Sequence, residues 1–136
     1  MRGTGREERA AALLLRTARS RVGELRSRLA DIEAAALSAE TALGWLAEAV
    51  AAEEGARPGA PAVAAEFARF LEGAAEKRKA LSATRDTLAG ESLAIREMLS
   101  EALSEMKKLE RLLEINRRAA ARRASPALDG RRTGAA

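Results

Sequence analysis

Cysteine, histidine and tyrosine are absent from this sequence, and its only aromatic residues are Trp45, Phe67 and Phe70. Without cysteine there is no disulfide framework and no thiolate chemistry. Without histidine the commonest general base and metal ligand is missing. With so few large side chains, a chain of 136 residues buries little in a globular core. These absences weigh against an enzyme and favour an elongated protein.

Motifs for chemistry are also missing. The sequence has no glycine-rich phosphate loop followed by Lys and Ser or Thr, and its many glutamates recur on outer helical positions. No stretch approaches the roughly 20 apolar residues that a membrane-spanning helix needs. We therefore expect a soluble protein with no catalytic residues, no cofactor, no metal site and no membrane span.

What the sequence does contain is a heptad repeat in its first half. Apolar residues recur there at alternating spacings of three and four, the pattern of the a and d positions of a coiled coil. We call these positions, in both helices, the seam. In the first helix the seam consists of Leu15, Ala18, Val22, Leu25, Leu29, Ile32, Ala36, Ala39, Leu43, Leu46 and Val50. The pattern predicts a long helix packed against another helix.

A second heptad repeat follows, with three polar interruptions. Its seam consists of Phe67, Leu71, Ala74, Arg78, Leu81, Arg85, Leu88, Ser92, Ile95, Leu99, Ala102, Met106, Leu109, Leu113 and Asn116. We expect Arg78 and Arg85 to extend their charged groups to neighbouring acids and to help set the register. The alternative is that they belong to a docking surface.

Prolines and glycines separate the two repeats. Residues 55–61 hold two prolines and two glycines, which end a helix and begin another. The sequence predicts an all-α fold over residues 1–123: a long two-helix antiparallel coiled-coil hairpin with unequal arms. Helix one should span about residues 6–54, the bend 55–61 and helix two about 61–123, with a disordered basic tail at 124–136.

The register of this hairpin follows from its bend. Closing the chain symmetrically around Pro58 places a residue i opposite a residue near 116 minus i, so residues 111–123 should project beyond helix one. Folding would also bring together residues 1–28 and 117–136, each with a net charge of +5, while residues 29–76, with a net charge of −7, surround the bend. The basic end favours an acidic protein surface, nucleic acid or anionic lipid as its partner.

The aromatic residues offer a second candidate surface. Phe67 and Leu71 lie on the seam and Phe70 flanks it, so part of this cluster could be exposed for docking. The alternative is core packing near Ala49 and Val50. Trp45 lies one residue before the seam and should point outward, where it either covers a neighbouring helix or contacts a partner.

Two segments carry a family resemblance. FARFLEGAAEKRKAL at 67–81, after the bend, and MKKLERLLE at 106–114, late in helix two, resemble the flagellar export protein FliJ family, to which the YscO-type stalk proteins of virulence secretion are similar. The resemblance covers about residues 8–123. It implies a non-enzymatic stalk protein of a bacterial flagellar, type III protein export apparatus, cytoplasmic and peripheral at the inner membrane.

The resemblance also implies partners and their contact residues. The stalk would insert into a hexameric export ATPase, promote its activity, and link it to the export gate and to export chaperones. The contact with the cytoplasmic domain of the export gate would fall on Phe67, Phe70, Leu71 and Ala74. The ATPase contact would be made by the basic residues Arg16, Arg19, Lys107, Lys108 and Arg111.

Two other functions are compatible with the residues alone. A homo-oligomeric coiled-coil scaffold or adaptor could use the same seam. A nucleic-acid-binding hairpin could use the basic end, although no interleaved aromatic residues or zinc ligands accompany its arginines. We therefore expect no nucleic-acid partner.

Overall fold

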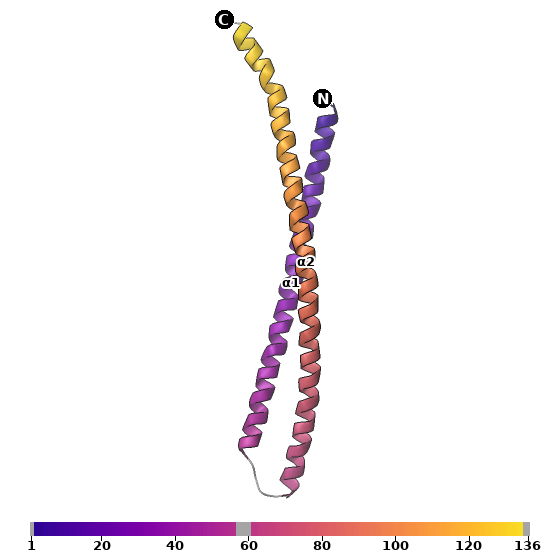
Figure 1. The fold of residues 1–136 in the computed structure, drawn as a ribbon, viewed down its shortest axis with the longest axis vertical. Helices are drawn as coiled ribbons and strands as arrows, with labels where there is room; N and C mark the ends of the chain where they lie inside the picture. The colour runs from indigo at the N-terminus through magenta and orange to yellow at the C-terminus, as the bar shows by residue number, and fades with distance from the viewer. Residues whose placement is uncertain (1, 57–60, 135–136) are drawn as a thin grey trace. The chain divides into compact units, whose positions relative to one another are not determined.

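The part of the chain that the structure describes consists of two long helices (Figure 1). The computed structural model describes the backbone of residues 2–56 and 61–134 and the side chains of residues 5–56 and 61–124. Helix α1 spans Arg2–Gly55 with 54 residues, and α2 spans Pro61–Gly134 with 74 residues. The fold is all-α with helices of unequal length, as the heptad repeats predict.

The bend lies where the prolines and glycines place it. Helix α1 ends at Gly55 and α2 begins at Pro61, whose missing N–H group is harmless in a first helical turn. Both outer ends extend further than predicted, since α1 begins at Arg2 rather than near residue 6 and α2 ends at Gly134 rather than near residue 123. The disordered tail was predicted at residues 124–136, and the structure does not describe the side chains of residues 125–136. The disorder of this segment therefore stays a prediction.

The chain divides into two compact units, each built from one segment of each helix. Unit 1 comprises Met1–Arg26 and Glu97–Ala136, and unit 2 comprises Ser27–Arg96. Within each unit the two segments lie side by side and run antiparallel (Figure 1). Unit 2 contains the bend and is itself a helical hairpin.

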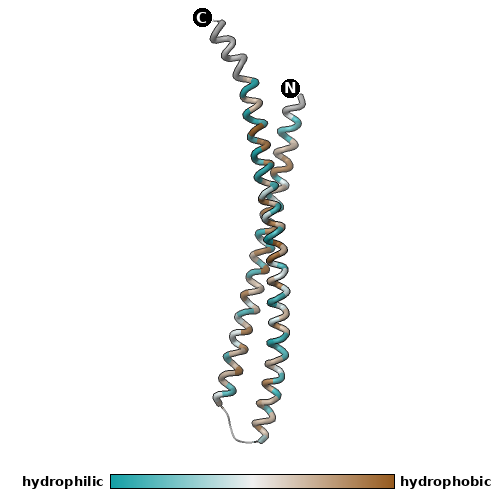
Figure 2. Tube along the Cα trace, viewed as in Figure 1, coloured by the Kyte–Doolittle hydropathy of each residue, from teal (hydrophilic) through white to brown (hydrophobic). Residues whose placement is uncertain are grey.

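Burial follows the predicted seam closely. All eleven seam residues of α1 and all but one of the fifteen in α2 are buried or half-buried, and the exception is Arg78. The most buried large side chain is Leu25, with 1% of its surface exposed. Apolar positions alternate with polar ones along both helices (Figure 2). Each unit is thus held by a narrow line of apolar contacts, and no polar side chain among those described is buried.

The register differs from the predicted one. In unit 1, Arg19 Nη2 lies 3.6 Å from Glu110 Oε1, whereas the predicted register places Arg19 opposite residue 97. In unit 2, Arg96 Nη2 donates a hydrogen bond of 2.8 Å to Glu33 Oε1. With Leu15 and Leu113 as a positions of their heptads, both pairs join residues that directly follow a d position. Such residues, the e positions, face each other across an antiparallel coiled coil. The helices are therefore displaced by more than one heptad from symmetrical closure around Pro58.

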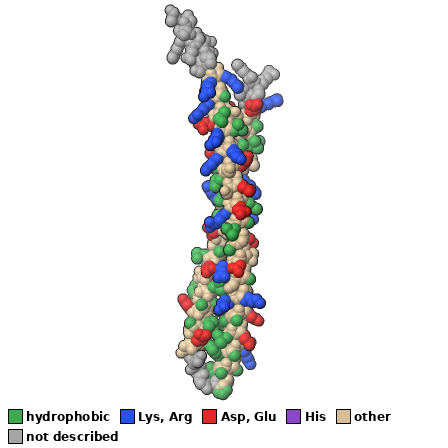
Figure 3. Space-filling model, in the orientation of Figure 1, with side chains coloured by type: hydrophobic (Ala, Val, Ile, Leu, Met, Phe, Trp, Pro, Cys, Tyr) green, Lys and Arg blue, Asp and Glu red, His purple; other side chains and the backbone are tan. Residues whose placement is uncertain are grey.

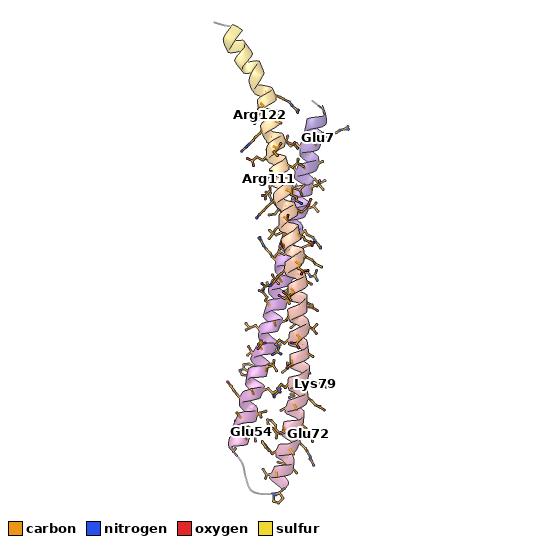
Figure 4. The ribbon with its side chains drawn as sticks, in the orientation of Figure 1. Glu7, Glu54, Glu72, Lys79, Arg111 and Arg122 are labelled. Atoms are coloured by element: carbon orange, nitrogen blue, oxygen red, sulfur yellow. The ribbon has the colours of Figure 1, made fainter. Side chains whose placement is uncertain are left out.

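The predicted projection of residues 111–123 beyond α1 is therefore wrong for the first part of that segment. Leu113 is buried in one cluster with Ala11 and Leu15, and Arg117 Nε lies 3.4 Å from Glu8 Oε1. Figure 4 shows Arg111 at a level where α1 still runs beside α2. This part of α2 belongs to the paired region of unit 1.

The polar seam residues of unit 2 behave in two ways. Arg85 is half-buried and extends its Nε toward Glu40 Oε1 at 3.7 Å and Asp86 Oδ1 at 3.4 Å, as predicted. Ser92 is half-buried and accepts a hydrogen bond from Arg96 Nε at 3.3 Å. Arg78 is exposed and forms no ion pair with another described residue, so the prediction of a neighbouring acid fails there.

Candidate functional site

A hollow of unit 2 lies at the bend. Figure 1 shows α2 beginning beyond the last turn of α1, with the two helices separating toward the bend. A groove of about 530 Å³ opens there, which we call the bend groove. It is lined by Glu53 in the last turn of α1, by Ala56 directly after that helix, and by Val63, Ala64, Glu66, Phe67 and Phe70 from the start of α2. Its floor is apolar and its rim carries two carboxylates.

The four residues predicted to contact the export gate divide between two places. Phe67 and Phe70 line the bend groove, where Phe67 is half-buried and Phe70 is 37% exposed. Leu71 and Ala74 line a different, smaller groove with Val50 from α1, and Ala74 is buried. Phe70 is therefore the exposed member of this set, while Phe67 and Leu71 are half-buried and Ala74 is buried. The alternative was core packing of the aromatic cluster near Ala49 and Val50. It is not favoured for Phe67, because Val50 lines the smaller groove and Phe67 lines the bend groove.

The smaller groove, about 320 Å³, holds the exposed Arg78. Residues of both helices line it, three of them alanines: Leu46, Ala47, Val50, Leu71, Ala74, Ala75 and Arg78. Alanine side chains are too short to fill the space between the two helices at these positions. Arg78 therefore lies at the edge of an incompletely filled interface. This position favours the alternative in which Arg78 belongs to a docking surface over the one in which it sets the register of the two helices.

Five lining residues of the bend groove were not predicted as part of the site, and the sequence holds a signal for one of them, Val63. Val63, Phe67 and Phe70 are spaced at i, i+4 and i+7, which places them on one face of a helix. Extending the aromatic cluster backward by one turn would have included Val63. Glu53 and Ala56 could not be found in this way, because their approach to Phe67 depends on the register.

The two units differ in charge. Unit 1 contains 16 Lys and Arg against nine Asp and Glu, a net charge of +7, and unit 2 contains eight against 11, a net charge of −3. Figure 3 shows Lys and Arg side chains along the α2 side of unit 1. The pairing of residues from both ends of the chain thus concentrates positive charge in unit 1, as predicted.

The five cations predicted to contact an ATPase all lie in unit 1, but not on one face. Arg16, Arg19 and Lys107 occupy b and e positions on one flank of the helix pair, whereas Lys108 and Arg111 occupy c and f positions further round α2. All five are exposed. Arg19 is partly neutralised by Glu110, at 3.6 Å. Arg16 also borders a shallow hollow on α1 with Thr17, Ser20, Arg21 and Glu24.

The single tryptophan is outward-facing. Trp45 is 69% exposed, in unit 2. This exposure agrees with its predicted position one residue before the seam. A side chain covering the neighbouring helix would be more buried than this.

Searches for other kinds of site among the described residues were negative. No group of three or more acidic residues is placed to hold a metal ion, and neither described helix has an apolar stretch long enough to cross a membrane. Comparisons with protein family models, with curated proteins and with solved structures found no match for this chain.

Proposed function

We propose that this chain is a non-enzymatic stalk protein of a bacterial flagellar, type III protein export apparatus. In this role unit 1 contacts a hexameric export ATPase, and the bend of unit 2 contacts the cytoplasmic domain of the export gate and the export chaperones. The chain would be cytoplasmic and would reach the inner membrane only through these partners. The resemblance at 67–81 and 106–114 motivates the assignment.

The observation that carries the proposal is the assembly of unit 1 from both ends of the chain. Segments about 100 residues apart in sequence pair to give one unit with a net charge of +7. Such a unit suits a pore or cleft lined by acidic groups, where complementary charge raises the association rate and sets the orientation. The ATPase would hydrolyse ATP, and this chain would act by binding one state of the ring more tightly.

The bend groove supports the second contact. It offers an apolar floor with Phe67 and Phe70, and its rim carries Glu53 and Glu66. A partner with an apolar anchor residue flanked by cations would fit it. Because α1 and α2 each run without a break through both units, binding at the bend and binding at unit 1 involve the same two helices.

A homo-oligomeric scaffold is the second candidate. It is favoured by the exposed leucines of unit 2, Leu37 with 68% and Leu93 with 66% of their surface accessible. Association through the seam itself is not favoured, because the seam is already covered within the chain. Self-association would therefore have to use the outer flanks.

The test is the hydrolysis rate of a type III export ATPase with and without the purified protein. We expect stimulation, and we expect it to be lost in a variant carrying Lys107→Glu, Lys108→Glu and Arg111→Glu. The matched control is Lys77→Glu, Arg78→Glu and Lys79→Glu, three reversals on the same helix in unit 2, which should leave stimulation intact.

Three outcomes separate the candidates. Stimulation lost only in the unit 1 variant supports the stalk proposal. No stimulation by a helical wild-type protein contradicts it. A concentration-dependent rise in mass by sedimentation, without any effect on the ATPase, would instead support the scaffold.

A further inference from the structure

Unit 1 exposes four large aliphatic side chains that the seam does not explain. They are Leu13, Leu14, Leu112 and Ile115, with 61, 55, 48 and 55% of their surfaces accessible. Together they present on the order of 300 Å² of apolar surface, the size at which an exposed patch on a monomer is often functional. We call these four residues the aliphatic patch.

The heptad positions place three of the four, Leu14, Leu112 and Ile115, on one flank of unit 1, while Leu13, two residues before an a position, faces outward next to that flank. Leu15 and Leu113 are buried in the same cluster, and Leu14 and Leu112 each precede one of them. Residues preceding an a position are g positions, and the g positions of an antiparallel pair face each other on one flank. Ile115 lies one turn after Leu112 on the same side of α2.

The opposite flank is already occupied by polar contacts. The ion pair between Arg19 and Glu110 joins two e positions, which face each other on the far side of the seam from the g positions. The two flanks of unit 1 therefore differ in kind. One carries an ion pair between the two helices, and the other carries apolar side chains that the described residues of unit 1 leave largely exposed.

Cations surround the aliphatic patch. Lys108 lies one turn before Leu112, Arg111 one turn before Ile115, and Arg21 two turns after Leu14. All three are exposed, and none forms an ion pair with another described residue. The acids at the same g positions are Glu7 and Glu105. The border of the patch is thus mainly positive, in a unit whose net charge is +7.

We propose that the aliphatic patch binds an acidic amphipathic helix of a partner protein. Leucine or isoleucine side chains of that helix would cover Leu14, Leu112 and Ile115, and its flanking glutamates or aspartates would meet the surrounding cations. A second copy of this chain is a poor occupant, because two units of net charge +7 would repel each other across the interface. The inference does not depend on the identity of the export machinery.

The probe for this test is a synthetic helical peptide of about 18 residues, five turns long, with leucines along one face and glutamates on both flanks. Its binding to the full-length protein is measured by fluorescence anisotropy. We expect a double variant, Leu14→Gln with Leu112→Gln, to bind at least about tenfold more weakly. Glutamine is a good helix former and the two sites are half-exposed, so helicity by circular dichroism should not change.

The matched control is Leu37→Gln with Leu93→Gln, which removes two leucines of unit 2 that are more exposed, with 68 and 66% of their surfaces accessible, and should leave binding unchanged. The same peptide with lysine in place of glutamate should bind at least about tenfold more weakly to the wild type. Absence of binding by the acidic peptide would overturn the proposal. So would equal loss in the control variant, preferential binding to vesicles of anionic lipid, or self-association through the patch.

Discussion

Leu14 and Leu15 are neighbours in sequence and the same residue type, yet their surroundings in unit 1 are opposite. Leu15 is 5% exposed and packs in a cluster with Ala11, Leu113 and the half-buried Met106 and Leu109. Leu14 is 55% exposed. Alanine and leucine are both strong helix formers, so Leu14→Ala and Leu15→Ala change the helix propensity of the chain by the same small amount. The difference between the two variants in the free energy of unfolding therefore reports the burial of Leu15.

For Leu15→Ala we expect a loss of about 2 to 3 kcal/mol in the free energy of unfolding. Burial of a leucine side chain is worth about 1.5–3 kcal/mol, and a further cost arises from the cavity that the surroundings fill only in part. The value falls at the lower end of the range for core leucines, because a pair of helices can close around a small gap more easily than a globular core. For Leu14→Ala we expect a change of about 0.5 kcal/mol or less.

The assay is urea unfolding followed by far-ultraviolet circular dichroism, with both variants compared at the same protein concentration. The expected result is a lower midpoint for Leu15→Ala and an almost unchanged midpoint for Leu14→Ala. Equal losses would refute the assignment of Leu15 to the seam. A larger loss for Leu14→Ala would mean that the g flank, rather than the seam, holds unit 1 together.

Three other changes follow from the described contacts. Gly44→Ala and Gly90→Ala should each raise the free energy of unfolding by about 1 kcal/mol, measured as a higher thermal midpoint, because an added Cβ meets no atom within 4 Å. A double-mutant cycle on Glu33 and Arg96 should give a coupling of about 0.5 kcal/mol that decreases with added salt, since both side chains are at least half-exposed. Phe70→Ala should leave circular dichroism unchanged but weaken binding of the export gate's cytoplasmic domain, and loss of helicity would instead assign Phe70 to the core.

Much of the fold could be predicted from the sequence because heptad spacing is a local pattern. The seam in α1 needed only the apolar residue types and their intervals, and the bend needed only the prolines and glycines of residues 55–61. The exposure of Arg78 could not be predicted in this way. It results from neighbouring alanines that leave the interface incompletely filled, which depends on which residues of α1 lie opposite.

The register is the property that local patterns could not supply. Two heptad helices can slide by seven residues and keep apolar positions in contact, so the seam alone does not select one alignment. Charged residues at the e positions do distinguish between these alignments. Sliding by one heptad toward the predicted register would bring Arg96 level with Arg26, and sliding by two would bring it level with Arg19. In the observed alignment Arg96 meets Glu33 and Arg19 meets Glu110.

This alignment also determines whether a bend groove exists. With symmetrical closure, Phe67 would lie opposite Ala49, and the seam would be covered up to the bend. In the observed alignment α2 begins beyond the last turn of α1 (Figure 1), and among the described residues Glu53 and Ala56 line the groove across from Phe67 and Phe70. The ion pairs that favour this alignment are individually weak, but each alternative replaces attraction by repulsion between arginines. Charge on the outer positions of the helices therefore favours an open apolar groove at the bend, where we place the contact with the export gate.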